Sequence, residues 1–288
     1  MQKLLIAASA LLAASVVVSG CSSAVNGSGQ AGSSAKGSAS GPASTSGSAP
    51  TTTAPSSSSS STTSSTFPSD VAGLAAKIQS GNSSIKSAHI RLSEQAGSTS
   101  VVGTGTEQLS GGKVKAIDLT ETVSGMTMQF RLVGGQVFAK VPQSVYPSTK
   151  PWLQISPTTT NAQLRQLYTS LQSALTAGTG DTIRLFVGVA KDLHLEGTGK
   201  LDGATVGHYA LSVDIASLPS SFPNRDVLEQ SGLTSIPVEL FVDAQGRTRR
   251  VTEKFTIAGQ SVSTVFDLTG IDVPVSISAP PGDQVEHV

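Results

Sequence analysis

The chain has 288 residues, which suffices for one or two domains, but its composition does not allow all of it to fold. Beyond residue 66 it carries 17 basic and 19 acidic residues, so charge gives no basis for binding nucleic acid or an anionic membrane surface. The single cysteine excludes a domain built on disulfides, which would need several cysteines in even number.

Residues 1–20 have the composition of an export signal. Lys3 supplies positive charge, and from Leu4 to Val18 every residue is apolar except two serines. This run is shorter than the roughly 20 residues of a membrane-spanning helix. It ends in Val18-Ser19-Gly20-Cys21, which resembles the lipobox of bacterial lipoproteins. We therefore expect cleavage before Cys21 and acylation of this cysteine (S-diacylglycerol and N-acyl), with an ordinary secretion signal and an incidental cysteine as the alternative.

Residues 21–66 are predicted to comprise the lipidated cysteine and a disordered linker. Of the 45 residues from Ser22 to Thr66, 41 are Ser, Thr, Gly, Ala or Pro. Such a segment has too few large apolar side chains to offset the entropy of ordering. As a flexible coil it would span about 35 to 40 Å, which would hold a folded domain away from the lipid head groups. Its hydroxyl groups are also possible attachment points for sugars.

The folded part is expected within residues 67–288, which contain all eight Phe, all three Tyr and the single Trp. It opens with a helix that Ser69 or Asp70 caps, because apolar residues from Val71 onward recur at helical spacing. Gly81-Asn82 is expected to kink or end this helix.

Strands follow from residue 88, where apolar and polar residues alternate. Tight hairpins are predicted at Gly111-Gly112 and Gly134-Gly135, and another short strand at Trp152-Leu153-Gln154-Ile155. This order is typical of an antiparallel meander.

The middle of the chain is predicted to be helical, in two segments around Leu164–Leu175 and Ile183–Ala190. A second group of strands follows between residues 209 and 268, and the Pro-rich tail from Ala279 is expected to leave the sheet. Because hairpins dominate over βαβ alternation, the predicted fold class is α+β, with one large curved antiparallel sheet and helices grouped against one face.

The sequence contains no catalytic or nucleotide-binding motif, and we expect neither an enzyme nor a bound cofactor. The four histidines are scattered singly, so no metal site is predicted. Gly103-Thr104-Gly105 and Gly197-Thr198-Gly199 lack a third glycine at dinucleotide-binding spacing and are interpreted as turns. A small basic cluster, Arg247, Arg249 and Arg250, is interpreted as a solvated edge, with a contact for lipid phosphates or glycans as the alternative.

Aromatic residues make up only 4% of the chain, so the predicted sheet faces are lined mainly by aliphatic side chains. A wide sheet with few rings can leave a cavity, although a tight aliphatic core explains the composition nearly as well. Candidate lining residues, taken from the apolar strand faces, are Phe130, Leu132, Phe138, Leu240 and Phe255.

The chain resembles a known group in the order of its elements and in three stretches: Ser87–Leu92, Gly207–Val213 and Ile236–Asp243. It resembles the actinobacterial LppX/LprAFG lipoproteins, relatives in fold of the lipoprotein carrier LolA. The resemblance implies a half-barrel sheet with helices packed against its concave face and an apolar cavity between them. It also implies binding of acylated lipids or glycolipids and help in moving them outward through the cell envelope.

Two functions are therefore expected for a lipoprotein anchored to the extracytoplasmic face of the cell membrane. The first is binding and transfer of an acylated lipid or glycolipid, with a membrane transporter as a further possible partner. The second is a structural or signalling surface module that binds protein or glycan and carries no lipid. The second predicts a filled core and an exposed apolar or aromatic patch instead of a cavity.

Overall fold

The computed structural model describes residues 66–288 apart from residues 178, 221, 223–224 and 258. The predicted export signal, the predicted acylation site at Cys21 and the linker up to residue 65 lie outside these described residues. No helix in the described part of the chain is long and apolar enough to cross a membrane.

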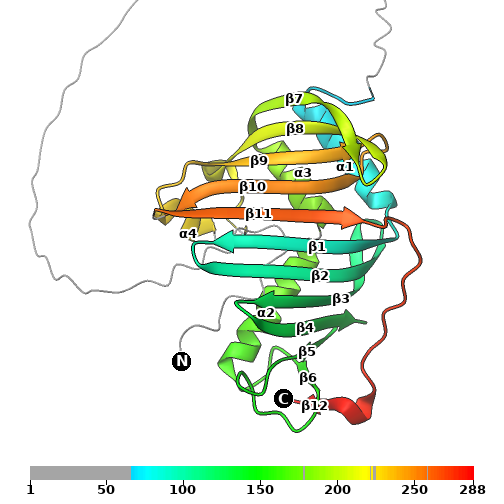
Figure 1. Cartoon of the computed structure of the whole chain (residues 1–288), viewed down its shortest axis with the longest axis vertical. Coiled ribbons are helices and arrows are strands. Elements are labelled where there is room, and N and C mark those ends of the chain that lie inside the picture. The colour runs from blue at the N-terminus through cyan, green and yellow to red at the C-terminus, as the bar shows by residue number, and fades with distance from the viewer. Residues whose placement is uncertain (1–65, 178, 221, 223–224, 258) are drawn as a thin grey trace, which may run out of the picture. The chain divides into compact units, whose positions relative to one another are not determined.

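Twelve strands form one open sheet in the order β12-β6-β5-β4-β3-β2-β1-β11-β10-β9-β8-β7 (Figure 1). The strands are β1 (Ser87–Ala96), β2 (Thr99–Ser110), β3 (Lys113–Val123), β4 (Met126–Val133), β5 (Gln136–Lys140), β6 (Trp152–Ile155), β7 (Ala190–Leu201), β8 (Ala204–Asp214), β9 (Ser235–Asp243), β10 (Thr248–Ile257), β11 (Gln260–Thr269) and β12 (Val285–His287). Neighbours pair antiparallel except β12, which pairs parallel to β6. The predicted α+β class with a broad hairpin sheet is confirmed, with the sheet mixed at one edge.

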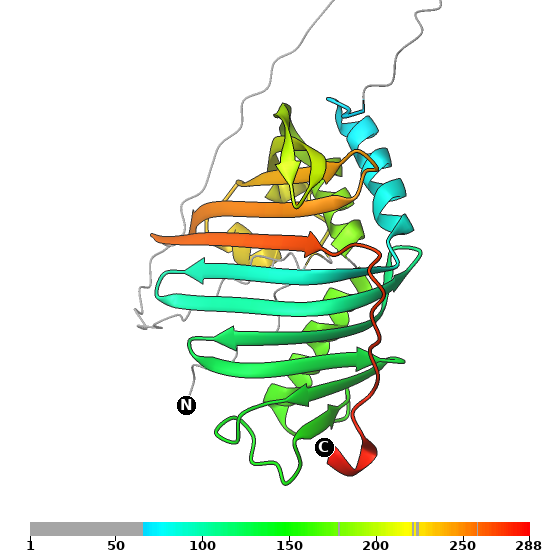
Figure 2. The same ribbon diagram turned by 45° about the vertical axis from the view of Figure 1, so that its right-hand side comes forward.

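Three helices, α1 (Val71–Ser84), α2 (Ala162–Ala177) and α3 (Thr179–Gly188), lie on one side of this sheet, behind the strands in Figures 1 and 2. A short helix, α4 (Arg225–Gln230), precedes β9, and two single 3-10 turns occupy Ile215–Ser217 and Gly282–Gln284. We call the face that α1, α2 and α3 cover the helix-facing side and the opposite face the outer side. Most of the apolar residues in the strands lie at alternate positions and point to the helix-facing side, because successive side chains of a strand point to opposite faces.

Helix α1 begins as predicted, with the Asp70 carboxylate accepting a hydrogen bond from the Gly73 amide at 2.8 Å. It does not end or break at Gly81-Asn82. Gly81 instead packs so closely against the backbone of Gly246, in the β9–β10 turn, that a Cβ atom would overlap it. The Asn82 side chain is buried and accepts from the Thr248 amide at 2.9 Å. Both residues therefore join the helix to the sheet.

The two Gly-Thr-Gly stretches lie inside strands β2 and β7, so their interpretation as turns was wrong. On the helix-facing side of β2, Gly105 leaves no room for a Cβ atom against the Asp118 carbonyl oxygen. Gly103 has the Leu92 and Glu121 side chains beside it, at 3.3 and 3.5 Å from the position of an added Cβ. Close approach of neighbouring groups explains Gly103 and Gly105 better than a change of chain direction does.

The C-terminal segment does not stay away from the sheet. After β11 it crosses the ends of several strands (Figure 2), where Gln108 and Arg131 donate hydrogen bonds to the carbonyl oxygens of Val275 and Ser278. It then returns as β12, and the Glu286 carboxylate accepts from the Thr149 amide at 2.9 Å. These bonds explain why a Pro-rich tail ends as an edge strand.

Candidate functional site

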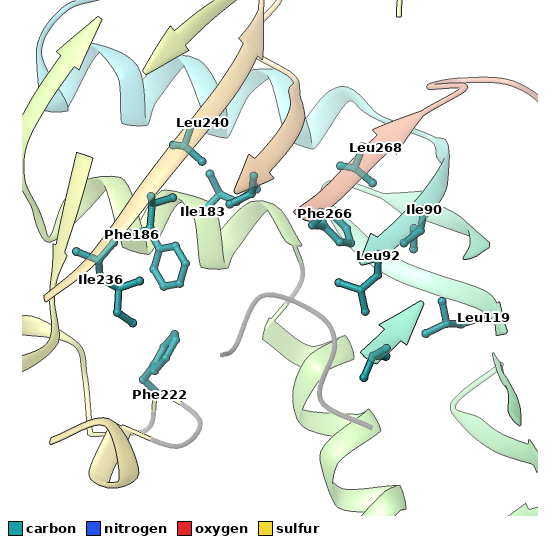
Figure 3. Close-up of a cluster of buried hydrophobic side chains, with 14 of the residues drawn as sticks. Ile90, Leu92, Leu119, Ile183, Phe186, Phe222, Ile236, Leu240, Phe266 and Leu268 are labelled. Atoms are coloured by element: carbon teal, nitrogen blue, oxygen red, sulfur yellow. The ribbon is translucent and has the colours of Figure 1, made fainter. Parts of the chain in front are cut away.

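The helix-facing side of the sheet carries a continuous layer of apolar side chains. Figure 3 shows Leu92, Leu240 and Phe266 from three strands together with Ile183 and Phe186 from α3. The Phe186 ring lies 5.8 Å, centroid to centroid, from that of Phe222 in the loop before α4. All of these side chains are buried. The layer between sheet and helices is therefore mainly aliphatic, with a few rings, as the composition predicted.

Four of the five predicted lining residues belong to this layer: Phe130, Leu132, Leu240 and Phe255. Phe138 does not lie with them. It pairs with Arg131 in the β4–β5 register, one residue out of phase with Phe130, and therefore lies on the outer side. There it forms a small separate cluster with Trp152 and Val285.

Carboxyl groups interrupt the apolar layer. Glu94 on β1, Glu121 on β3 and Glu253 on β10 share their strand faces with apolar core residues, and each is at least nine-tenths buried. Thr264 on β11 stands directly between two of them, because its register partners are Glu94 on one side and Glu253 on the other. We call Glu94, Glu121, Glu253 and Thr264 the inner carboxyl cluster.

Glu121 reaches this cluster across strand β2. Its register partner on β2 is Gly103, and its Cγ atom leans over the position where a side chain of that residue would stand. Gly103 in turn pairs with Leu92 on β1, two residues before Glu94. The missing side chain at Gly103 therefore leaves space between β1 and β3 that the glutamate occupies.

Several polar atoms of this cluster have no hydrogen-bond partner among the described residues: Glu121 Oε2, Glu253 Oε1 and Thr264 Oγ1. None of the ion pairs of the described chain includes the three glutamates. Burial raises the pKa of Glu94 and Glu253 to about 7 and that of Glu121 to about 8. The negative charge of Glu94 contributes to the rise of the pKa in the other two.

Two further buried polar groups on the same side have no hydrogen-bond partner in the described part of the chain. Glu107 on β2 has a free Oε2 atom, and burial raises its pKa to about 7. The Tyr209 hydroxyl on β8 is likewise unpartnered, and burial raises its pKa to about 12. Buried polar atoms of folded proteins normally have a hydrogen-bond partner, so this concentration requires an explanation.

The basic cluster at the β9–β10 hairpin is not a solvated edge. Asp243, whose side chain is 1% exposed, accepts from Arg247 Nε at 2.8 Å and pairs with Arg249 at 2.9 Å. Arg250 pairs with Asp267 on the outer side at 2.5 Å. These guanidinium groups are therefore engaged within the fold. Across the described residues, no three or more His, Cys, Asp or Glu side chains gather in a way that would hold a metal ion.

The buried glutamates were not predicted from the sequence, although it contains a signal for them. Each stands in phase with the apolar residues of its strand, as Glu94 does with Ile90 and Leu92. The position of each glutamate in the alternating pattern predicts that it lies on the buried face, whereas its charge predicts that it is exposed to solvent. The two predictions conflict at these positions. An acidic residue in phase with a buried strand face was therefore the sign of an unusual interior.

No protein-family model matches this sequence, and no curated protein matches it. Among solved structures the chain is similar to the lipoprotein LppX of Mycobacterium tuberculosis, with 13% identity, a TM-score of 0.47 and coverage of 72% of this chain and 99% of that one. It is also similar to LprF from Mycobacterium bovis, with 14% identity, a TM-score of 0.45 and coverage of 75% and 100%. A putative outer membrane lipoprotein-sorting protein domain from Vibrio parahaemolyticus matches at 8% identity and a TM-score of 0.28, over 70% of this chain and 92% of that domain. At these identities the likenesses concern the fold alone.

Proposed function

We propose that this protein is a membrane-anchored lipoprotein of the cell envelope, that it binds an acylated lipid or glycolipid between its sheet and helices, and that it helps to transfer this lipid outward. The observation that carries the proposal is the helix-facing layer, which is aliphatic yet contains polar atoms that have no hydrogen-bond partner among residues 66–288 as described. A sealed core would not leave such atoms unsatisfied, whereas a binding site leaves them for its ligand.

The binding energy would come mainly from the acyl chain. Each methylene group moved from water into an apolar environment contributes about 0.8 kcal/mol. One acyl chain therefore supplies a large affinity without any specific polar contact. Phe130, Leu132, Leu240 and Phe255 would contact the chain, since all four belong to the apolar layer.

Native mass spectrometry tests this function. The chain from residue 21 onward, carrying Cys21→Ala to remove the acyl anchor, is mixed with a total lipid extract of an actinobacterial envelope. We expect complexes with acylated species at one lipid per chain. A folded protein that stays empty after this treatment would contradict lipid binding.

A matched pair of variants places the lipid on one side of the sheet. Phe255→Trp adds volume on the helix-facing side, and we expect it to lower lipid occupancy several-fold. Phe138→Trp adds the same volume on the outer side and should leave occupancy unchanged. Equal effects of the two variants would exclude the space between sheet and helices.

The surface-module alternative finds little support in the described residues. It predicts an exposed apolar or aromatic patch, but the large hydrophobic side chains that are exposed there are Val102 and Val273. These lie on β2 and in the C-terminal segment, and two single valines do not make a patch. We therefore retain lipid binding as the proposal.

The anchor at Cys21 completes the proposed function. Acylation of Cys21 would attach the chain to the extracytoplasmic face of the cell membrane, and residues 22–66 would set how far the folded domain reaches. We expect Cys21→Ala to move the protein from the membrane fraction to the soluble fraction, with its lipid binding retained. Subcellular fractionation checks this, and protein that remains in the membrane fraction would argue for another mode of attachment.

A further inference from the structure

We propose that the inner carboxyl cluster is a hydroxyl-binding site, which receives the hydroxyl groups of the bound lipid between the sheet and the helices. This inference rests on the proposed function and specifies where the polar part of the bound lipid would lie. Apolar chains and polar groups would then bind in the same buried layer.

The four side chains of the inner carboxyl cluster come from neighbouring strands. Glu253, Thr264 and Glu94 are direct neighbours across β10, β11 and β1, where side chains on one face stand about 5 Å apart. Glu121 approaches from β3 over Gly103. Four oxygen-bearing side chains from β3, β1, β11 and β10 therefore lie on the same side of the sheet, with Glu94 and Thr264 between Glu121 and Glu253 in the strand order.

Three members of the inner carboxyl cluster lack hydrogen-bond partners. Glu121, Glu253 and Thr264 each keep an oxygen without a partner among the described residues, and all three side chains are at least nine-tenths buried. Thr264 is evidence of a different kind from the glutamates. Its hydroxyl is uncharged, so a bound counter-ion would not explain why it is buried here. Leaving these atoms unpaired disfavours the folded state without a ligand, and a ligand with matching polar groups would recover this loss on binding.

The polar groups of the cluster favour a ligand that carries hydroxyl groups. A hydroxyl group both donates and accepts, so it can pair with a carboxylate, with a protonated carboxyl and with the Thr264 hydroxyl. An ammonium group only donates, and a quaternary ammonium group does neither. Since burial raises the pKa of these carboxyls to about 7 or 8, protonated and ionised forms coexist near neutral pH, and a hydroxyl fits both.

Binding of matched lipid pairs tests the proposal. Dipalmitoylglycerol is compared with its monogalactosyl derivative, and stearic acid with a hydroxystearic acid, because the hydroxyl groups can stand on a head group or on a chain. We expect the hydroxylated member of at least one pair to bind about tenfold more tightly, which corresponds to one well-made hydrogen bond. The pair that shows the preference identifies the source of the hydroxyl.

The variant Glu121→Met/Glu253→Met should abolish this preference and keep the affinity for the lipid without hydroxyl groups. Glu107→Met is the matched control: it removes another buried carboxyl from the same side, four residues along β2 from Gly103, or about 13 Å. This control should retain the preference. Glu121→Gln and Glu253→Gln keep a hydrogen-bonding amide of similar shape and should retain most of it.

Three results would overturn the proposal. The first is binding of both members of each pair with equal affinity, as expected if water alone satisfies the cluster. The second is a preference that survives in the folded double Met variant, or in the single variants Glu121→Met and Glu253→Met if a melting curve shows the double variant to be unfolded. The third is tighter binding of a trimethylammonium lipid with the same chains. Failure of every probe to bind would instead contradict the proposed lipid binding itself.

Discussion

The protein should be less stable at pH 8 than at pH 5, by at least about 3 kcal/mol in the free energy of unfolding. The buried carboxyls of Glu94, Glu107 and Glu253 have pKa values of about 7 and that of Glu121 about 8, against 4.5 for the exposed group. One unit of difference in pKa corresponds to about 1.4 kcal/mol, so the rise in the pKa of Glu121 by itself accounts for the expected loss.

The direction follows from proton binding in the two states. Between about pH 4.5 and 7 the folded protein keeps protons on these carboxyls that the unfolded chain has released, so stability falls as the pH rises. The loss begins above the unfolded pKa of 4.5 and is complete above about pH 8. The pKa of Glu286 is lowered, mainly by its hydrogen bond with Ser148, and its contribution is lost only in more acidic solution.

Urea unfolding at a series of pH values measures this dependence, with Glu121→Gln/Glu253→Gln as the test variant. Neutral amides do not ionise, so the variant should show a weaker dependence and exceed the wild type in stability at pH 8. Asp214→Asn is the control, because its partner Lys191 and Ser217 lower the pKa of this carboxyl out of the same pH range. A flat profile for the wild type would show that the glutamates are solvated.

Asp243→Ala should destabilise the fold by about 3 kcal/mol or more. The Asp243 carboxylate is 1% exposed and pairs with Arg247 and Arg249, whose side chains are also largely buried. It also accepts hydrogen bonds from the Gln245 and Arg247 amides, at 3.0 and 2.9 Å, within the β9–β10 turn. Removing one partner of a buried ion pair leaves an uncompensated charge, which typically costs about 3 to 5 kcal/mol.

Denaturant unfolding at neutral pH measures this loss. Asp267→Ala is the matched control, since it breaks the pair with Arg250, whose side chain is 34% exposed, and should cost about 1 kcal/mol or less. Asp243→Asn keeps an acceptor for the two amides and should fall between the two alanine variants. Equal losses for Asp243→Ala and Asp267→Ala would mean that the turn does not depend on the buried carboxylate.

Local sequence patterns predicted most of the elements. The Asp70 cap and the apolar residues that follow predicted α1, and the paired glycines predicted hairpins at Gly111-Gly112 and Gly134-Gly135, where all four residues have positive φ. These signals succeed because a cap or a two-residue turn depends on neighbouring residues alone. The failures, such as Gly103 within β2, occur where another part of the chain determines the need for a glycine.

The sequence by itself determined the proposed anchor at Cys21, the composition of the linker, the fold class and the phase of several strands, such as that of Ile90 and Leu92 in β1. Only the tertiary structure decided that β1 pairs with β11, which brings Glu94 beside Thr264 from a distant part of the chain. It also decided that Phe138 lies apart from Phe130 and that β12 joins β6. Which strands pair, and in which register, depends on the burial and pairing of residues that are far apart in the sequence. A local sequence pattern therefore does not determine them.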